Sequence, residues 1–330
     1  MLRSRRTATV LASLATATAL AASVLAPAQA AAPTVELQPH QMTRGADIAV
    51  PHIEDGRWGD VFVDGARRIE LPGRVARVIG RSGDSWLVGT NNVDRKRNRR
   101  VVRVAPDGSV TDVLRNVDPS TVILSADGST LAWQRFVSKG RKVVTYAGAA
   151  ADGTVLGSKG PARNITLLDV DATRVVLAGG KRVFQWRPAT GKSRTIVKKM
   201  SGLADIEHDL LSIYSKDPYL GGCTKLVRLS KPRVKVWKSC RDRVAAISPD
   251  GAEMLTFHIL TDGLGPNEIR LREVDGTRLA TYRTNWFSDW AWESPSTVLL
   301  DVNGKRKSAT VRCTLGDCEN ATDPVKVQTP

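Results

Sequence analysis

Short turn-forming pairs recur through this chain at a nearly constant spacing, and they alternate with short β-rich runs. The first turn series consists of Gly83-Asp84, Asp127-Gly128, Asp171, Asp209, Asp250-Gly251 and Ser294-Pro295. The second, interleaved turn series consists of Asp107-Gly108, Asp152-Gly153, Thr190-Gly191, Ser230-Lys231, Asp275-Gly276 and Leu315-Gly316. A repeat of about 40 to 45 residues with four short strands is typical of a β-propeller blade. The spacing therefore predicts an all-β propeller.

The blade count follows from dividing the chain at these turns. Four-stranded units fall near residues 73–116, 117–160, 161–199, 200–240, 241–283 and 284–323. Ahead of them, Asp47 to Pro72 contains three strands, one fewer than a full blade. We therefore predict seven blades, with six as the alternative. Because an open sheet leaves unpaired edges, we expect Val325 to Gln328 to supply the missing strand of the N-terminal blade.

Two of the turns carry a family resemblance. Ser125-Ala126-Asp127-Gly128, followed by Leu131, and Ser248-Pro249-Asp250-Gly251, followed by Met254, resemble the Ser-Pro-Asp-Gly turns of TolB-like and WD-repeat-like bacterial propellers. The chain has neither the Gly-His pair nor the Trp-Asp dipeptide of true WD repeats. The resemblance implies a secreted bacterial propeller, and a fold by itself does not define a function.

The N-terminus has the pattern of a secretory signal peptide over residues 1–30. Three Arg residues within the first six positions precede an Ala/Leu-rich run, Val10 to Leu25, and the small-residue cleavage site Ala28-Gln29-Ala30. An uncleaved membrane anchor is the alternative, but hydroxyl side chains dilute this run. We expect a secreted, extracytoplasmic protein without a transmembrane span in the mature chain. Residues 31–45 are predicted to be a mobile tail, and residues 46–328 a single propeller domain.

The four cysteines suit an oxidising compartment. Cys223 and Cys240 flank two strands about a common turn, and Cys313 and Cys318 flank Leu315-Gly316. Hairpin register places the members of each pair opposite one another, which favours the two local disulfides. Free thiols or a zinc site are the alternatives, although the spacing is not that of paired CxxC ligands. No metal and no cofactor are predicted.

Signatures of catalysis are missing from the sequence. It has no Gly-x-Ser-x-Gly elbow and no His-Glu-x-x-His. Two long loops at equivalent positions of neighbouring units offer a rim pocket in which polar side chains converge. Its candidate residues are Tyr214, Asp217, Tyr219, His258 and Asp262. The competing interpretation is that these loops are packed by their own Tyr and Pro residues. No catalytic residue is assigned.

The run Trp286 to Trp292 has alternating aromatics, with Trp290 and Trp292 on one side. Bulky aromatics fill the wedges between twisted sheets, so packing between blades is the prediction, and carbohydrate stacking is the alternative.

Charge gives the sharpest inference about the surface, because the chain has a net charge of +16. In a four-stranded blade, both turn series lie on one face, and that face collects Asp residues because tight turns favour them. The loops between the second and third strands lie on the opposite face. The basic residues predicted to bind there are Arg95, Lys96, Arg97, Arg99, Arg100, Lys139, Arg141, Lys305, Arg306 and Lys307. Solvated loops are the competing interpretation.

Two functions follow from these observations. The first is a non-catalytic binding or scaffold propeller, a monomer, whose basic face docks on anionic envelope polymers or on an acidic protein partner. Specific nucleic-acid binding is not expected, because these loops lack interleaved aromatics. The alternative is a propeller hydrolase or lyase with its site at the rim loops 214–222 and 258–267.

Overall fold

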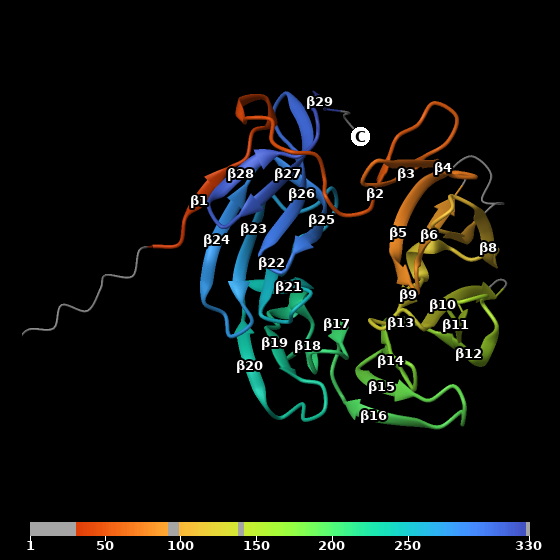
Figure 1. Cartoon of the computed structure of the whole chain (residues 1–330). Coiled ribbons are helices and arrows are strands. Elements are labelled where there is room, and N and C mark those ends of the chain that lie inside the picture. The colour runs from red at the N-terminus through yellow and green to blue at the C-terminus, as the bar shows by residue number, and fades with distance from the viewer. Residues whose placement is uncertain (1–30, 92–98, 138–141, 328–330) are drawn as a thin grey trace, which may run out of the picture. The chain divides into compact units, whose positions relative to one another are not determined.

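Seven sheets follow one another along the chain in a computed structural model that describes residues 31–91, 99–137 and 142–327 (Figure 1). They are the blades of an all-β propeller, as predicted, and they exclude six blades. No helix in these ranges is long and apolar enough to cross a membrane.

The first four blades use the chain up to residue 197. Blade 1 contains β2 (His52–Glu54), β3 (Val61–Asp64) and β4 (Arg67–Glu70). Blade 2 contains β5 (Arg74–Ser82), β6 (Ser85–Asn91), β7 (Arg100–Val104) and β8 (Val110–Arg115). Blade 3 contains β9 (Ile123–Leu124), β10 (Thr130–Val137), β11 (Lys142–Ala149) and β12 (Val155–Arg163). Blade 4 contains β13 (Ile165–Val170), β14 (Val175–Gly179), β15 (Arg182–Trp186) and β16 (Ser193–Val197).

The last three blades complete the repeat. Blade 5 contains β17 (Ser201–Asp205), β18 (Leu210–Tyr214), β19 (Thr224–Arg228) and β20 (Lys235–Ser239). Blade 6 contains β21 (Asp242–Ile247), β22 (Glu253–His258), β23 (Glu268–Glu273), β24 (Arg278–Arg283) and, beside β24, β1 (Thr34–Glu36). Blade 7 contains β25 (Trp286–Ser294), β26 (Thr297–Asn303), β27 (Lys307–Thr314), β28 (Asp317–Asn320) and, beside β27, β29 (Val325–Lys326). Single 3-10 turns are η1 (Pro39–Gln41), η2 (Pro119–Thr121) and η3 (Pro218–Leu220).

The turn chemistry explains the regular spacing. In blade 3, the Ser125 hydroxyl donates to Asp127 Oδ1 at 2.5 Å, and the Ser129 amide donates to the same oxygen at 3.0 Å. These bonds hold the pKa of the Asp127 carboxyl below its usual value. Gly128 has φ +70°, and a Cβ there would lie 2.3 Å from the Arg81 carbonyl of the preceding blade. Glycine is therefore needed both for the turn and for the close approach of two blades.

Buried apolar side chains fill the boundaries between consecutive blades. Six clusters are found among the described residues, and each joins one pair of neighbours from blades 1 and 2 to blades 6 and 7. At the 6–7 boundary, Phe287 and Tyr282 are fully buried, and Trp290 packs on Phe257 with 5.3 Å between ring centroids. This contact is the predicted packing between blades. In the same ranges, no such cluster joins blade 7 to blade 1.

The prediction of a mobile tail over residues 31–45 is wrong. β1 pairs in parallel with β24, the Leu37 amide donates to the Arg283 carbonyl at 2.7 Å, and the Leu37 side chain is 0% exposed. The outer edge of blade 6 thus offers both main-chain partners and an apolar site, which outweigh the entropy of ordering the segment. We call residues 34–50 the N-terminal strap.

The predicted place of the C-terminal strand is also wrong. Val325 and Lys326 form β29, which pairs with Ser308 and Lys307 of β27 in blade 7, not with blade 1 (Figure 1). Gln328 lies outside the described residues. A short connection after β28 returns the chain directly to the start of β27, so the nearest free edge is in the same blade. Blade 1 consequently keeps three strands.

The strap reaches blade 1 across blade 7. The Arg312 guanidinium donates to the carbonyls of Ala46 at 2.9 Å and of Asp47 at 2.8 Å, and it is paired with Glu293. The Glu293 carboxylate also accepts from the Ala49 amide at 2.8 Å. Arg312 and Glu293 therefore hold the backbone of the strap just before it enters β2.

Candidate functional site

The predicted basic residues divide into three groups. Arg95, Lys96, Arg97, Lys139 and Arg141 lie outside the described residues.

Arg99 and Arg100 are described, and each forms an ion pair. The partner of Arg99 lies in the connection from blade 2 to blade 3, and the partner of Arg100 lies in β8 of its own blade. Arg99 lies 2.8 Å from Asp118, and Arg100 lies 3.2 Å from Asp112. Both guanidinium groups are thus engaged in ion pairs, which makes them less available to a ligand than exposed, unengaged groups would be.

Lys305 and Arg306 lie in the connection between β26 and β27, and Lys307 is the first residue of β27. Lys305 and Arg306 are exposed, whereas Lys307 is half-buried and opens β27 opposite Lys326. The Lys305 amide donates to the Gln38 side chain at 3.0 Å, so the N-terminal strap contacts and holds this loop. Of the predicted binding residues, Lys305 and Arg306 are the two most freely presented to solvent in the described ranges.

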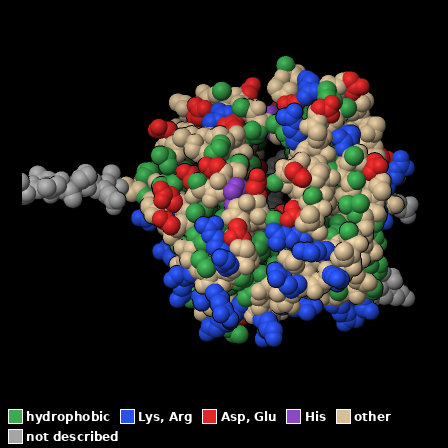
Figure 2. Space-filling model, turned by 60° about the horizontal axis from the view of Figure 1, so that its bottom comes forward, with side chains coloured by type: hydrophobic (Ala, Val, Ile, Leu, Met, Phe, Trp, Pro, Cys, Tyr) green, Lys and Arg blue, Asp and Glu red, His purple; other side chains and the backbone are tan. Residues whose placement is uncertain are grey.

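The strand order places connections of opposite charge at opposite ends of the strands. The turns between the first and second strands, and between the third and fourth, carry more acids than bases. The acids are Asp84, Asp107, Asp127, Asp152, Asp171, Glu207, Asp209, Asp250 and Asp275, and the bases are Arg174, Arg187, Lys192, Lys231 and Arg233. The remaining connections carry more bases: Arg57, Arg99, Lys181, Lys198, Lys199, Lys216, Arg241, Lys305 and Arg306. Figure 2 shows one face of the molecule, on which acidic side chains lie beside a central hollow and Lys and Arg gather along the lower border.

The rim loops of blades 5 and 6 meet through one hydrogen bond. The Tyr219 hydroxyl donates to Asp262 Oδ2 at 3.2 Å, and Tyr219 is 68% exposed. Asp217 instead accepts the Tyr219 amide at 2.9 Å, which caps η3. The hydrogen bond to Asp262, which needs the Tyr219 proton, raises the pKa of the Tyr219 hydroxyl, and the negative charge of the carboxylate adds to the shift. This direction is opposite to the one that a tyrosine base or nucleophile requires.

The other two rim candidates do not join this contact. His258 is exposed, and its Nδ1 atom accepts the Leu260 amide at 3.3 Å. Tyr214 is half-buried in β18. Among the described residues, no group of three His, Cys, Asp or Glu side chains is arranged to hold a metal ion.

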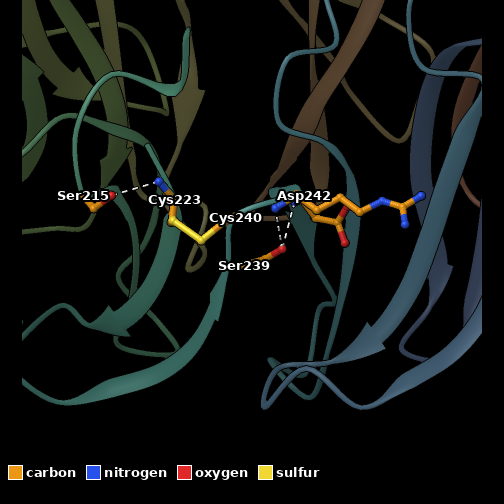
Figure 3. Close-up of a disulfide and its surroundings, with 6 residues drawn as sticks. Ser215, Cys223, Ser239, Cys240 and Asp242 are labelled. Carbon is orange, nitrogen blue, oxygen red and sulfur yellow. Dashed lines mark hydrogen bonds between the residues drawn. A yellow bond between two sulfur atoms is a disulfide. The ribbon is translucent and has the colours of Figure 1, made fainter. Parts of the chain in front are cut away.

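Both predicted disulfides are present, Cys223–Cys240 and Cys313–Cys318. Figure 3 shows the first, which joins the end of a rim loop to the crossover between blades 5 and 6. The Cys223 amide donates to Ser215 Oγ at 2.9 Å, and Ser239 Oγ accepts the Asp242 amide at 2.9 Å. The disulfide therefore fixes the base of the rim loop beside Asp242, which forms a buried ion pair with Arg270 at 2.6 Å.

The 7–1 boundary was missed by the sequence reasoning, and it contains two open clefts. The inner cleft has a volume of about 740 Å³ and is lined by the first strands of blades 2 and 7, β5 and β25, together with β2. The strap cleft, of about 640 Å³, lies between β2, the strap and the polar side of blade 7. The three-stranded blade was the sequence signal that could have pointed to this boundary.

Most of the inner-cleft wall is apolar, and among its charged side chains four acids outnumber Arg74 and Arg77: Asp55, Asp60, Asp289 and Asp301. Desolvation by the cleft walls, and to a smaller extent the neighbouring Asp301, raise the pKa of the exposed Asp289 carboxyl, while the Trp290 amide and Arg77 lower it. Asp289 accepts the Trp290 amide at 2.8 Å, and Asp301 accepts the Thr310 hydroxyl at 2.6 Å. An acidic cleft is thus built into a protein of net charge +16.

No protein-family model matches this sequence. No curated protein matches it either. Among solved structures, the β-propeller domain of the Trilobed protease from Pyrococcus furiosus, which has an open velcro topology, is similar with a TM-score of 0.60. The identity is 12% over 80% of this chain and 86% of that chain. An oligogalacturonate lyase in complex with manganese is similar with a TM-score of 0.52 and 13% identity, over 84% of this chain and 86% of that chain.

TolB from Acinetobacter baumannii aligns more distantly, with a TM-score of 0.44 and 11% identity over 68% of this chain and 63% of that chain. The protease and lyase alignments support the propeller fold and nothing finer. The predicted propeller fold is therefore supported at low identity, and kinship with TolB-like or WD-repeat-like proteins stays a prediction.

Proposed function

We propose that this chain is an exported, non-catalytic binding propeller whose basic connections dock on an anionic polymer of the cell envelope. The observation that carries the proposal is the uneven charge of the two kinds of connection, because tight turns favour Asp whereas the turn chemistry gives no reason for an excess of Lys and Arg in the opposite connections. Among these basic residues, Lys305 and Arg306 are exposed and available to a ligand. Arg is suited to bidentate contacts with phosphate groups.

Export is part of the proposal. The leader-like residues 1–30 predict it, and the two disulfides are compatible with an oxidising compartment outside the cytoplasm. Polyanions in that setting include phosphate-bearing wall polymers and phospholipid headgroups.

The test is binding of the purified protein to poly(glycerol phosphate) over a series of salt concentrations. Screening of exposed charges predicts that binding weakens at least ~10-fold between ~0.05 and ~0.5 M salt. The variant Lys181→Ala/Lys305→Ala/Arg306→Ala should lose most of the binding. The matched control Lys192→Ala/Lys231→Ala/Arg233→Ala removes equal charge from turns on the opposite side and should retain it. Equal losses in the two variants would show that only net charge matters and would sink the proposal.

An acidic protein partner is the other outcome of this test, indicated if the polymer does not bind but an acidic envelope protein is retained at low salt. The enzymatic alternative, a hydrolase or lyase at the rim loops, has one favourable observation, the Tyr219–Asp262 contact between neighbouring blades. Its test is His258→Ala. An activity on an anionic polysaccharide that this substitution leaves unchanged would remove His258 from the mechanism.

A further inference from the structure

Blade 1 lacks its innermost strand. β4 runs into β5 through residues 71–73, as the outer strand of each following blade runs into the first strand of the next one. β4 is therefore the outer strand, and β2 takes the second position. β2 is the end strand of its sheet, so its inward edge has no partner strand in the described part of the chain. An unpaired strand edge is a ready template for another strand.

The inner cleft lies where that strand would be. It is bounded by β25 of blade 7 on one side, β5 of blade 2 on the other and β2. Apolar parts of its wall come from Ile53, Ala76, Val78, Trp290 and Leu299. A strand paired with β2 would lie about 4.8 Å from it, which is inside the cleft. The cleft, of about 740 Å³, has room for one extended segment with side chains on both sides.

The chain's own spare segments are used elsewhere. β1 is paired with β24, and β29 is paired with β27. Residues 46–49 are held on blade 7 by Arg312 and Glu293. The described residues therefore supply no candidate for the innermost position of blade 1.

The charges of the inner cleft select the occupant. The two arginines in its wall donate to backbone carbonyls: Arg74 to Arg57 at 3.1 Å, and Arg77 to Val122 at 3.2 Å. Asp60 accepts the Ala76 amide at 2.6 Å. The carboxylates of Asp55, Asp289 and Asp301 remain to attract cations. An acidic wall with apolar patches complements a segment in which basic and aliphatic side chains alternate.

We propose that the inner cleft binds an extended segment of a partner protein, rich in Lys or Arg alternating with aliphatic residues, which adds to the free edge of β2 as the missing innermost strand of blade 1. Main-chain hydrogen bonds provide affinity in this mode, and alternate side chains provide specificity. Since a strand rises about 3.3 Å per residue, about five residues span the edge. The site is separate from the basic connections of the proposed function and does not depend on them.

The first experiment measures binding of a blocked, fluorescent Lys-Val-Lys-Val-Lys peptide to the full chain. Two further peptides carry N-methyl groups on the valines or on the lysines, which removes the amide donors from one edge or from the other at unchanged charge. Strand addition predicts at least ~10-fold weaker binding of one methylated peptide and near-normal binding of the other, because only one edge faces β2. Equal binding of all three peptides would overturn the proposal, and so would no saturable binding at millimolar peptide.

Two variants place the peptide in the inner cleft. Ala291→Trp fills the space beside β25, and we expect it to weaken binding at least ~10-fold. Asp289→Asn removes one charge, and we expect a several-fold loss that high salt abolishes. Hydrogen exchange at residues 52–54 should slow when the peptide binds. The control Lys305→Ala/Arg306→Ala must leave peptide binding unchanged. If this control weakens peptide binding and Ala291→Trp does not, the peptide binds another surface and the inference is overturned.

Discussion

The 6–7 and 7–1 boundaries of this propeller are built in opposite ways. At the 6–7 boundary, blades share a continuous buried cluster that includes Phe287, Tyr282 and Leu300. At the 7–1 boundary, the described residues leave two clefts, lined by acids and crossed by the N-terminal strap. Apolar burial stabilises by roughly 25 cal/mol per Å² of surface removed from water, so the first boundary is maintained by area. The second depends on a few charged contacts. One boundary of a repeat fold can therefore lack an apolar cluster while the other six bury apolar side chains among the described residues.

The largest expected loss of stability comes from a substitution in the apolar 6–7 boundary. Phe287→Ala should lower the free energy of unfolding by about 3 to 5 kcal/mol, because a fully buried aromatic leaves a cavity. Urea unfolding followed by tryptophan fluorescence measures it. The matched control on the other boundary is Ile48→Ala, for which we expect about 1 kcal/mol, since Ile48 lines both clefts of the 7–1 boundary and is only half-buried. Equal costs for the two would mean that the 7–1 boundary is packed as tightly as the 6–7 boundary.

The next effect tests the strap. Arg312→Met removes the donors to Ala46 and Asp47 and leaves the Glu293 carboxylate without its guanidinium. We expect a loss of about 2 kcal/mol and faster hydrogen exchange over residues 44–50. The control is Arg283→Met, whose partner Glu268 lies 2.7 Å away but whose side chain is 49% exposed. That exposed pair should be worth less than about 1 kcal/mol. If hydrogen exchange over the strap is unchanged in Arg312→Met, the Arg312–Glu293 pair does not hold the strap on blade 7.

The third prediction is a pH dependence of the same contact. The Arg312 guanidinium holds the pKa of the Glu293 carboxyl below its usual value of 4.5. A lowered folded-state pKa contributes stability that is present above the unfolded pKa and is lost as pH falls through the folded pKa. Strap exchange, corrected for its intrinsic pH dependence, should therefore accelerate below about pH 4.5. Glu293→Gln should flatten this change; a pH response identical to that of the unmodified protein would contradict the assignment.

Asp289 titrates with the opposite sign at the 7–1 boundary. Desolvation by the surrounding cleft walls raises the pKa of its carboxyl in the folded state, although the residue is exposed at the cleft surface. Its contribution therefore favours folding as pH falls and is lost as pH rises through that pKa. Asp289→Asn therefore serves as the control for the Glu293 measurement, because it should steepen the acid-induced loss instead of flattening it.

The smallest effect concerns the wall of the inner cleft. Val75 has φ +52° and is 58% exposed, a strained conformation for a β-branched residue at a bulge in β5. Val75→Gly should stay within about 0.5 kcal/mol of the unmodified protein, because relief of strain offsets the entropy of glycine. Val78→Gly, three residues along the same strand, should cost at least about 1 kcal/mol. A large loss from Val75→Gly would show that its side chain contributes to packing.

Much of the fold was predictable because its signals are local. Asp127-Gly128 and Asp250-Gly251 form tight turns through hydrogen bonds within a few residues, so their spacing reports the blades directly. The Cys313–Cys318 disulfide follows from hairpin register in the same way. The predictions for the strap and β29 were wrong because each segment is short and has no repeating pattern of apolar residues that would indicate its partner strand. Leu37 is buried only because the edge of β24 and blade 7 provide its site.

The sequence by itself determined the repeat, the seven blades, the two disulfides and the excess of positive charge, because each depends on turn chemistry, register or composition. Only the tertiary structure decided which boundary would lack an apolar cluster. That outcome depends on where β1 and β29 pair, since both spare strands attach to blades 6 and 7 and leave blade 1 short of its innermost strand. The acids of the β2–β3 connection lie far in the sequence from those of β25 and β26; they line one cleft only because the last blade meets the first.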